Sequence, residues 1–79
     1  FNHRIDWIRL NPYSKASLEQ IQAGEQMVLS YPTKYNLIKY AKLLAFNGYE
    51  DEAKHQLQRL KVIQKTELSY EELIQDMPR

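Results

Sequence analysis

The stretch Leu43–Leu57, "LLAFNGYEDEAKHQL", decides the fold because one helical run ends within it and another begins. The first run stops at Asn47-Gly48, and glycine is the usual residue with positive φ just after a helix. The second run begins with three acidic residues, 50–52, which suit the positive end of a helix dipole. The sequence therefore predicts two helices joined by a tight corner, over about Lys34–Phe46 and Glu50–Lys65.

Both predicted helices carry apolar residues at helical spacing, which predicts that they pack face to face. A small residue on each helix, Ala41 and Ala53, would let the two backbones approach closely. Three lysines, Lys34, Lys39 and Lys42, occupy the remainder of the first helix and are expected to face solvent. The apolar positions are Leu37, Tyr40, Ala41, Leu44 and Ala45 on the first helix, and Ala53, Leu57 and Leu60 on the second.

Three further helices are predicted outside this pair. The first spans about Asn2–Leu10, ends at Asn11-Pro12, and contains Trp7, which would either anchor at a membrane interface or, as we favour, pack onto the next helix. The second spans about Ser17–Ser30, and the third about Tyr70–Asp76. Capping boxes mark the last two, at Ser17 with Gln20 and Ser69 with Glu72, and the apolar stripe of the 17–30 helix is Leu18, Ile21 and Val28.

These elements predict an all-α domain, a small array of about five antiparallel helices over residues 1–79. Connections are short, and the two glycines and three prolines are too few for a domain rich in β-turns. Helical pattern begins almost at Phe1, so we interpret the chain as a fragment of a larger protein. The absence of cysteine excludes disulfides, thiolate zinc sites and cysteine nucleophiles. A net charge of +1, with basic residues on no single stripe, argues against nucleic-acid binding.

Residues 34–65 resemble a tetratricopeptide-type helix-turn-helix repeat, a unit of about 34 residues. The residues that carry the resemblance are Leu37, Tyr40, Ala41, Leu44, Gly48, Ala53, Leu57 and Leu60. One departure is Lys65, which stands where such repeats usually carry a closing proline. Another is that only one unit is clear, so the flanking helices would have to act as caps.

Residues 30–65 also resemble the C-terminal soluble domain of bacterial protein O-oligosaccharyltransferases, of the O-antigen ligase and polymerase superfamily. The matching positions are Tyr31-Pro32, Tyr40-Ala41, Leu44-Ala45, Gly48, Glu52-Ala53 and Arg59-Leu60. The resemblance implies a parent glycosyltransferase with many spans in the inner membrane, which moves a lipid-linked glycan onto Ser or Thr of a periplasmic protein such as pilin. This chain would be its periplasmic tail. The family's catalytic residues lie in loops outside these 79 residues.

The sequence predicts no catalytic, cofactor-binding or metal-ligating residue in this chain. His55 with Asp51 and Glu52 has the spacing of metal ligands, but the acidic pair is explained by its place at a helix start. No glycine-bracketed nucleophile and no phosphate-binding glycine loop is present. The candidate partner-binding residues are Tyr35, Ile38, Lys39 and Lys42, on the helix that lines the concave surface of stacked hairpins.

Two functions from different classes follow. The first is an accessory domain of a membrane oligosaccharyltransferase, which contacts the membrane-embedded remainder of the parent, the acceptor protein or the lipid-linked glycan. The second is a tetratricopeptide-like scaffold that binds a partner protein without any link to glycosylation. Ten or more hydrophobic spans upstream would favour the first, on the resemblance above. A parent with further repeats of about 34 residues and no spans would favour the second.

Overall fold

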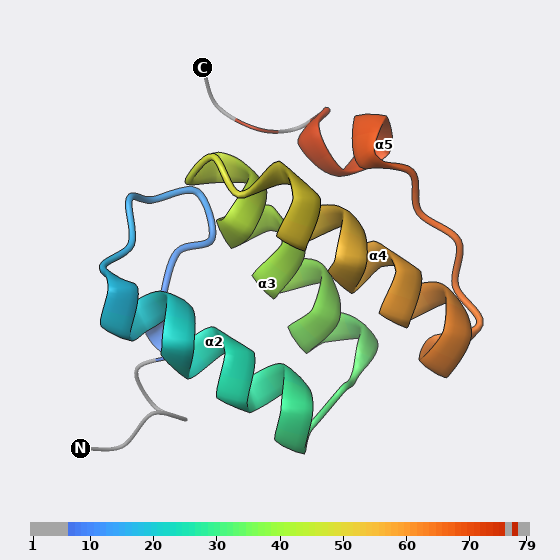
Figure 1. Ribbon diagram of the computed structural model, residues 1–79, viewed down its shortest axis with the longest axis horizontal. Coiled ribbons are helices and arrows are strands. Elements are labelled where there is room, and N and C mark those ends of the chain that lie inside the picture. The colour runs from blue at the N-terminus through green and yellow to red at the C-terminus, as the bar shows by residue number, and fades with distance from the viewer. Residues whose placement is uncertain (1–6, 76, 78–79) are drawn as a thin grey trace.

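The computed structural model describes residues 7–75 and residue 77. Helix α2 is Leu18–Ser30, α3 is Lys34–Phe46, α4 is Glu50–Gln64 and α5 is Tyr70–Ile74, and residues 7–9 are also helical (Figure 1). No β-strand occurs in this described part of the chain. The predicted all-α fold class is therefore confirmed.

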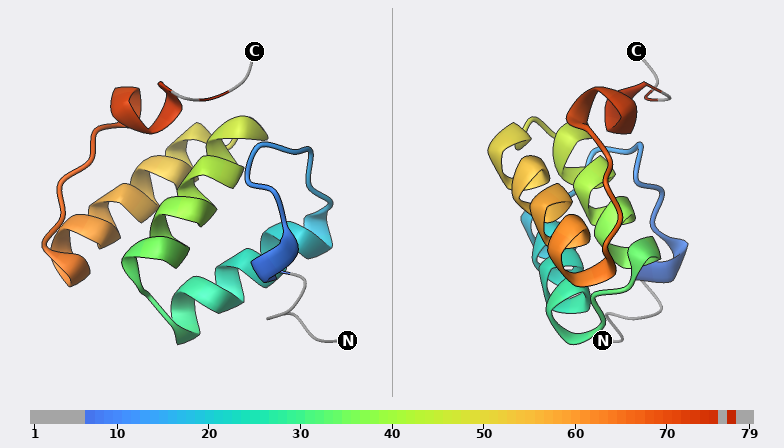
Figure 2. Two further views of the ribbon diagram at one scale, coloured as in Figure 1. Left: turned by 180° about the vertical axis from the view of Figure 1, so that it is seen from behind. Right: turned by 90° about the vertical axis from the view of Figure 1, so that its right-hand side faces the viewer.

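Helix α3 lies at the centre of the molecule. Helices α2, α3 and α4 each run antiparallel to the next, and α5 packs against both α3 and α4 (Figure 1). The segment of residues 7–16 passes over α3 on the side away from α4, as both views in Figure 2 show. One side of α3 is thus covered by α4, and the opposite side by residues 7–16.

Polar side chains begin the helices as the sequence predicts. The Ser17 hydroxyl accepts a hydrogen bond from the Gln20 amide, and the Gln20 side chain accepts one from the Ser17 amide, which completes a capping box. Thr33 caps α3 by accepting from the amide of Asn36. Ser69 caps α5 by accepting from the Glu72 amide, but the predicted capping box is not completed there, because the Glu72 carboxylate accepts from the Ser69 hydroxyl, at 3.2 Å, and not from the Ser69 amide.

Two residues with positive φ end the hairpin helices. Gly48, with φ of 88°, makes the corner between α3 and α4, as predicted. Lys65, with φ of 55°, is the C-cap of α4, which ends one residue earlier than predicted. Proline holds φ near −65°. A proline could not adopt this conformation, so the lysine at the position of the usual closing proline reflects a different exit from α4.

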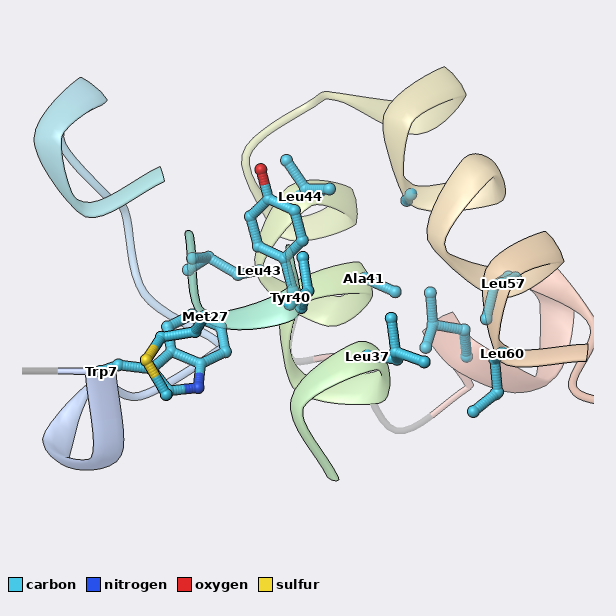
Figure 3. Packing of buried hydrophobic residues seen from close by; sticks show 12 residues of the cluster. Trp7, Met27, Leu37, Tyr40, Ala41, Leu43, Leu44, Leu57 and Leu60 are labelled. Atoms are coloured by element: carbon cyan, nitrogen blue, oxygen red, sulfur yellow. The ribbon is translucent and has the colours of Figure 1, made fainter. Parts of the chain in front are cut away.

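The interface between α3 and α4 is built from the apolar positions that the sequence predicts. Ala41 and Ala53 are both fully buried, and small side chains at these positions allow the helices to pack closely. Figure 3 shows Leu37 and Ala41 on the side of α3 that faces α4. Opposite them stand the buried side chains of Leu57 and Leu60.

The buried face of α2 differs from the predicted stripe. Leu18 is 67% exposed, whereas Val28 is fully buried, because α2 meets α3 through its later turns. Gly24 faces the core, where an added Cβ would stand only 2.6 Å from Cδ1 of Tyr40 and 2.8 Å from Cζ3 of Trp7. The absence of a side chain at Gly24 therefore admits two aromatic rings, which is the close approach that a glycine inside a helix permits.

Trp7 packs into the core, as we favoured. It is 1% exposed, and its ring meets the ring of Tyr40 edge-on at 6.1 Å between centroids. Ile8 is 57% exposed and stands outside the core. The described helix at this end stops at residue 9, one residue before the predicted end at Leu10, and residues 2–6 of the predicted first helix lie outside the described residues, as does Asp76 of the fifth.

Candidate functional site

Helix α3 holds the segment of residues 7–16 through polar side chains that the hydrophobic pattern does not predict. The Asn36 side-chain oxygen accepts a hydrogen bond from Nε1 of Trp7, at 3.1 Å. The Lys39 ammonium donates to the backbone oxygens of Trp7, at 2.6 Å, and Ile8, at 3.2 Å. These bonds fix the end of the first helical turn against the middle of α3.

Asn47, the C-cap of α3, holds the same segment further along. Its side-chain oxygen accepts from the amide of Ala16, at 2.9 Å, and its side-chain nitrogen donates to the carbonyl of Ser14, at 3.0 Å. Asn36, Lys39 and Asn47 together are called the polar clasp below. The clasp sets the course of residues 7–16 over α3.

The expectation that Lys39 faces solvent is wrong. Its side chain is only 6% exposed, and its ammonium lies 5.0 Å from the ring centroid of Trp7 and 5.6 Å from that of Tyr35. The physical reason is that backbone carbonyls at the end of a helix lack partners within the helix. A cation there satisfies them and suits the negative end of the dipole.

A groove of about 290 Å³ lies between α3 and the segment that the clasp holds. One wall is formed by Ile8, Leu10 and Pro12. The other wall is formed by Tyr35, Ile38, Lys39 and Lys42, the four residues that the sequence singles out as partner-binding candidates. The structure thus brings the four into one groove, while their binding of a partner stays a prediction. The first wall was missed because nothing in residues 8–12 indicates where that segment lies.

The groove is lined by apolar, aromatic and cationic groups together. Among its lining residues, Tyr35 is 61% exposed and Ile8 is 57% exposed. Lys42 is half-buried, with its ammonium 5.6 Å from the ring centroid of Tyr13. A cation over an aromatic face is held by attraction to the ring. The groove therefore presents positive charge beside open apolar surface.

A larger hollow of about 540 Å³ lies between α4 and residues 67–72, but both of its lysines are paired with carboxylates. Lys61 lies 3.1 Å from the Glu67 carboxylate, and Lys54 lies 3.2 Å from Glu50 and 5.3 Å from the Tyr70 ring centroid. The hydrogen bond from Lys54 to Glu50 raises the pKa of that lysine, and partial burial raises the pKa of Tyr70. Both lysines of this hollow thus have a carboxylate partner within the chain.

The residues that could serve in catalysis or metal binding are dispersed over the molecule. Asp51, Glu52 and His55 are exposed on α4, and within residues 7–75 and 77 no three His, Cys, Asp or Glu side chains gather as metal ligands would. Ser17 and Ser69 serve as helix caps. Burial, followed by the charges of Glu25 and Glu52, raises the pKa of Tyr40 to about 12, which keeps this phenol neutral. The described helices include none long and apolar enough to cross a bilayer.

Comparison with known proteins finds a glycan-transferring enzyme. A general O-oligosaccharyltransferase of Acinetobacter baylyi (strain ATCC 33305 / BD413 / ADP1) is 32% identical over 75 residues, which are 95% of this chain. The match spans only 13% of the length of that protein. No protein-family model matches the chain, and no solved structure matches it. Nearly the whole chain is thus similar to a small part of an O-oligosaccharyltransferase.

Proposed function

We propose that this chain is a helical accessory domain of a protein O-oligosaccharyltransferase, and that it performs no chemistry itself. The observation that carries the proposal is the 32% identity across 95% of the chain but only 13% of the relative. A segment that small, built as a compact helical array with its own core, is organised as a module attached to a larger enzyme. The transfer of glycan would belong to the remainder of the parent.

The module is proposed to lie in the periplasm, as a tail of an inner-membrane protein. The resemblance of residues 30–65 to the soluble C-terminal domains of such transferases supports this placement. The antiparallel hairpin of α3 and α4, with alanines at its contact and Gly48 at its corner, supports a tetratricopeptide-like unit over 34–65 within one domain. Proteins with such hairpins commonly present the first helix to a partner.

The proposed task of the module is to position the acceptor protein for transfer, or to support the parent's periplasmic loops. The groove along α3 is the surface that suits this task, because it combines open apolar groups with positive charge. Aromatic residues, with exposed apolar surface around them, are typical of surfaces that bind proteins. Tyr35, Ile38, Lys39 and Lys42 are thus proposed as the binding residues on α3.

The test measures glycan transfer by the full-length parent in membranes. The double substitution Tyr35→Ala with Lys42→Ala removes an aromatic ring and a cation from the groove and keeps the three clasp residues and their hydrogen-bonding groups. We expect kcat/KM for the acceptor protein to fall at least about tenfold, on loss of two partner contacts of about 1 kcal/mol each. Lys34→Ala, on the same helix but outside the groove, is the matched control and should transfer normally.

Removal of residues 1–79 provides the stronger version of the same test. Full transfer by the truncated enzyme, at normal abundance in the membrane, would overturn the accessory role. Transfer that is lost in the truncation but normal in the groove double variant would leave the module essential. It would also move the contact away from α3 to another surface of the domain.

A further inference from the structure

The groove beside α3 has a composition that selects its occupant. Of its lining side chains, two are cationic, Lys39 and Lys42, and none is a carboxylate. In the described residues, carboxylate partners within 4.0 Å occur at Lys54 and Lys61, both on α4, and not at either groove lysine. The positive charge of the groove therefore lacks a neutralising group from these parts of the chain.

Ammonium groups donate hydrogen bonds and accept none. Lys39 directs its ammonium at two backbone oxygens, which leaves donor capacity but no acceptor at this point. Lys42 rests near the ring of Tyr13 and also lines the groove, with no acceptor for its ammonium among the described residues. A ligand that complements such a lining must bring acceptors, and a negative charge most of all. Sugar hydroxyls, which need acceptors as well as donors, are matched less well.

The apolar groups favour a peptide over a small anion. Ile8, Leu10, Pro12 and Ile38 give the groove an aliphatic surface, which an inorganic or lipid-linked diphosphate would leave uncovered. A diphosphate also needs more donors than two lysines supply, one of which is committed to backbone oxygens. Apolar side chains next to a carboxylate would cover that surface and neutralise the charge at once.

The length of the groove sets the size of the segment. Tyr35, Ile38, Lys39 and Lys42 follow one another along two turns of α3, a rise of about 10 Å. An extended chain advances about 3.3 Å per residue, so three or four residues span this distance. A groove of about 290 Å³ accommodates the side chains of such a segment and little more.

We propose that this groove binds a short extended segment of the acceptor protein in which an acidic side chain lies between apolar ones. The identity of the partner as the acceptor rests on the function proposed above, whereas the acidic-apolar chemistry rests on the groove alone. The acidic side chain lies between Lys39 and Lys42. Its apolar neighbours contact Ile8 and Ile38, and the ring of Tyr35 covers one end.

The test uses the nitrogen-15-labelled chain of 79 residues and three blocked hexapeptides, followed by amide NMR. The first peptide is Ala-Ile-Glu-Val-Asp-Ala, the second replaces its acids by Gln and Asn, and the third replaces them by Lys. We expect the acidic peptide to shift the amides of Ile8, Ile38 and Lys42. Its Kd should be at least about tenfold below that of the amide-matched peptide, from one or two charge-assisted contacts.

Matched variants localise the preference. Lys42→Gln should reduce the preference for the acidic peptide to about threefold or less, since one of two cations is lost. Lys34→Gln, exposed on the same helix and outside the groove, should keep it in full. Circular dichroism checks that each variant is helical. Lys39 is left intact because it holds the backbone in place.

Three results would overturn the inference. One is equal binding of the acidic and amide-matched peptides. Another is a set of shifted amides around α4 and residues 67–72 instead of α3. The third is that inorganic diphosphate shifts the groove amides at lower concentration than the acidic peptide, which would make this an oligophosphate site.

Failure of this inference and failure of the proposed function are distinguishable. The peptide measurement needs no transfer reaction, whereas the proposed function is tested by transfer in the full-length parent. Peptide binding without any glycan transfer by the parent would overturn the function alone. Transfer that depends on Tyr35 and Lys42, without a preference for acidic peptides, would overturn the inference alone.

Discussion

The two sides of helix α3 are held by different kinds of interaction. On the side of α4, the contact consists of buried aliphatic side chains, with Ala41, Ala53 and Leu60 all fully buried. On the side of residues 7–16, the polar clasp makes directed hydrogen bonds to the Trp7 indole and to backbone groups, all more than 25 residues earlier in the chain. The comparison separates what a periodic pattern specifies from what a particular tertiary contact specifies.

The energetic consequences of the two contacts also differ. Apolar burial scales with the area removed from water and has no preferred direction, so similar side chains substitute for one another. A buried donor or acceptor, in contrast, costs about 1–3 kcal/mol when its partner is removed, because it stays desolvated. The α4 side should therefore tolerate exchange for apolar side chains of similar volume, and the clasp side should tolerate few changes of chemistry.

The largest expected effect is on the α4 side. Leu60→Ala should lower the free energy of unfolding by about 2–5 kcal/mol, because a fully buried leucine leaves a cavity. Urea unfolding followed by circular dichroism measures the loss. Val62→Ala, on the same helix but 57% exposed, is the control and should change stability by less than about 1 kcal/mol. Equal losses would show that Leu60 is not part of a packed interface.

The clasp is tested next by Lys39→Met, which keeps the length and the apolar stem of the side chain. Both carbonyls, of Trp7 and Ile8, then lose the ammonium, although the Trp7 carbonyl still accepts from the Leu10 amide at 3.3 Å, and the free energy of unfolding should fall by about 1–3 kcal/mol. Lys42→Met is the matched control and should stay within about 0.5 kcal/mol. A stable Lys39→Met protein would mean that the ammonium adds nothing to the attachment of residues 7–16.

Tyr40 lies in the middle of α3, where its ring packs edge-on against Trp7. Its ionisation makes the free energy of unfolding depend on pH. Its pKa is raised by burial to about 12 in the folded protein, from a usual value near 10. The neutral phenol is therefore favoured by folding. Its contribution is complete below pH 10, and up to about 2 kcal/mol is lost as pH rises from 10 to 12.

Unfolding experiments at pH 9 to 12 measure this loss. Tyr40→Phe should flatten the alkaline decline, because phenylalanine has no proton to lose. Tyr35→Phe, which changes a tyrosine that is 61% exposed, should leave the decline as it is in the wild-type chain. An identical decline in Tyr40→Phe would assign the alkaline sensitivity to other groups.

The smallest expected effect is a gain of stability at the exit from α4. Lys65→Gly should raise the free energy of unfolding by about 0.5–1 kcal/mol, because a left-handed backbone costs less for glycine than for lysine. Gln58→Gly, an exposed position inside the same helix, should instead lose about 1 kcal/mol. A loss in both variants would mean that the lysine side chain itself stabilises the exit.

The elements of the hairpin could be predicted from the sequence because local rules decide them. The bounds of α3 agree with the prediction at both ends, since Thr33 caps its start and Gly48 follows its end. The alternation of apolar and polar residues then places Leu57 and Leu60 inside. In each of these cases, propensity, capping and pattern point to the same answer.

The groove could be predicted only in part, for a physical reason. Its α3 wall follows from helical spacing, but its other wall depends on where residues 8–12 cross that helix. That position is set by Asn36, Lys39 and Asn47, whose partners lie about 30 residues away in sequence. A lysine on the polar face of a predicted helix is expected to face solvent. The sequence near Lys39 therefore gives no sign that this side chain is buried.

The position of Trp7 makes its fluorescence a probe of one particular contact in the molecule. It is the single tryptophan of the chain, and its ring lies where residues 7–16 meet α2 and α3. Its fluorescence therefore reports the detachment of that segment, whereas ellipticity at 222 nm reports mainly the longer helices. Coincident transitions would show that the clasp and the hairpin unfold as one cooperative unit. A fluorescence transition at lower denaturant would reveal a state in which the groove has lost one wall while the hairpin persists.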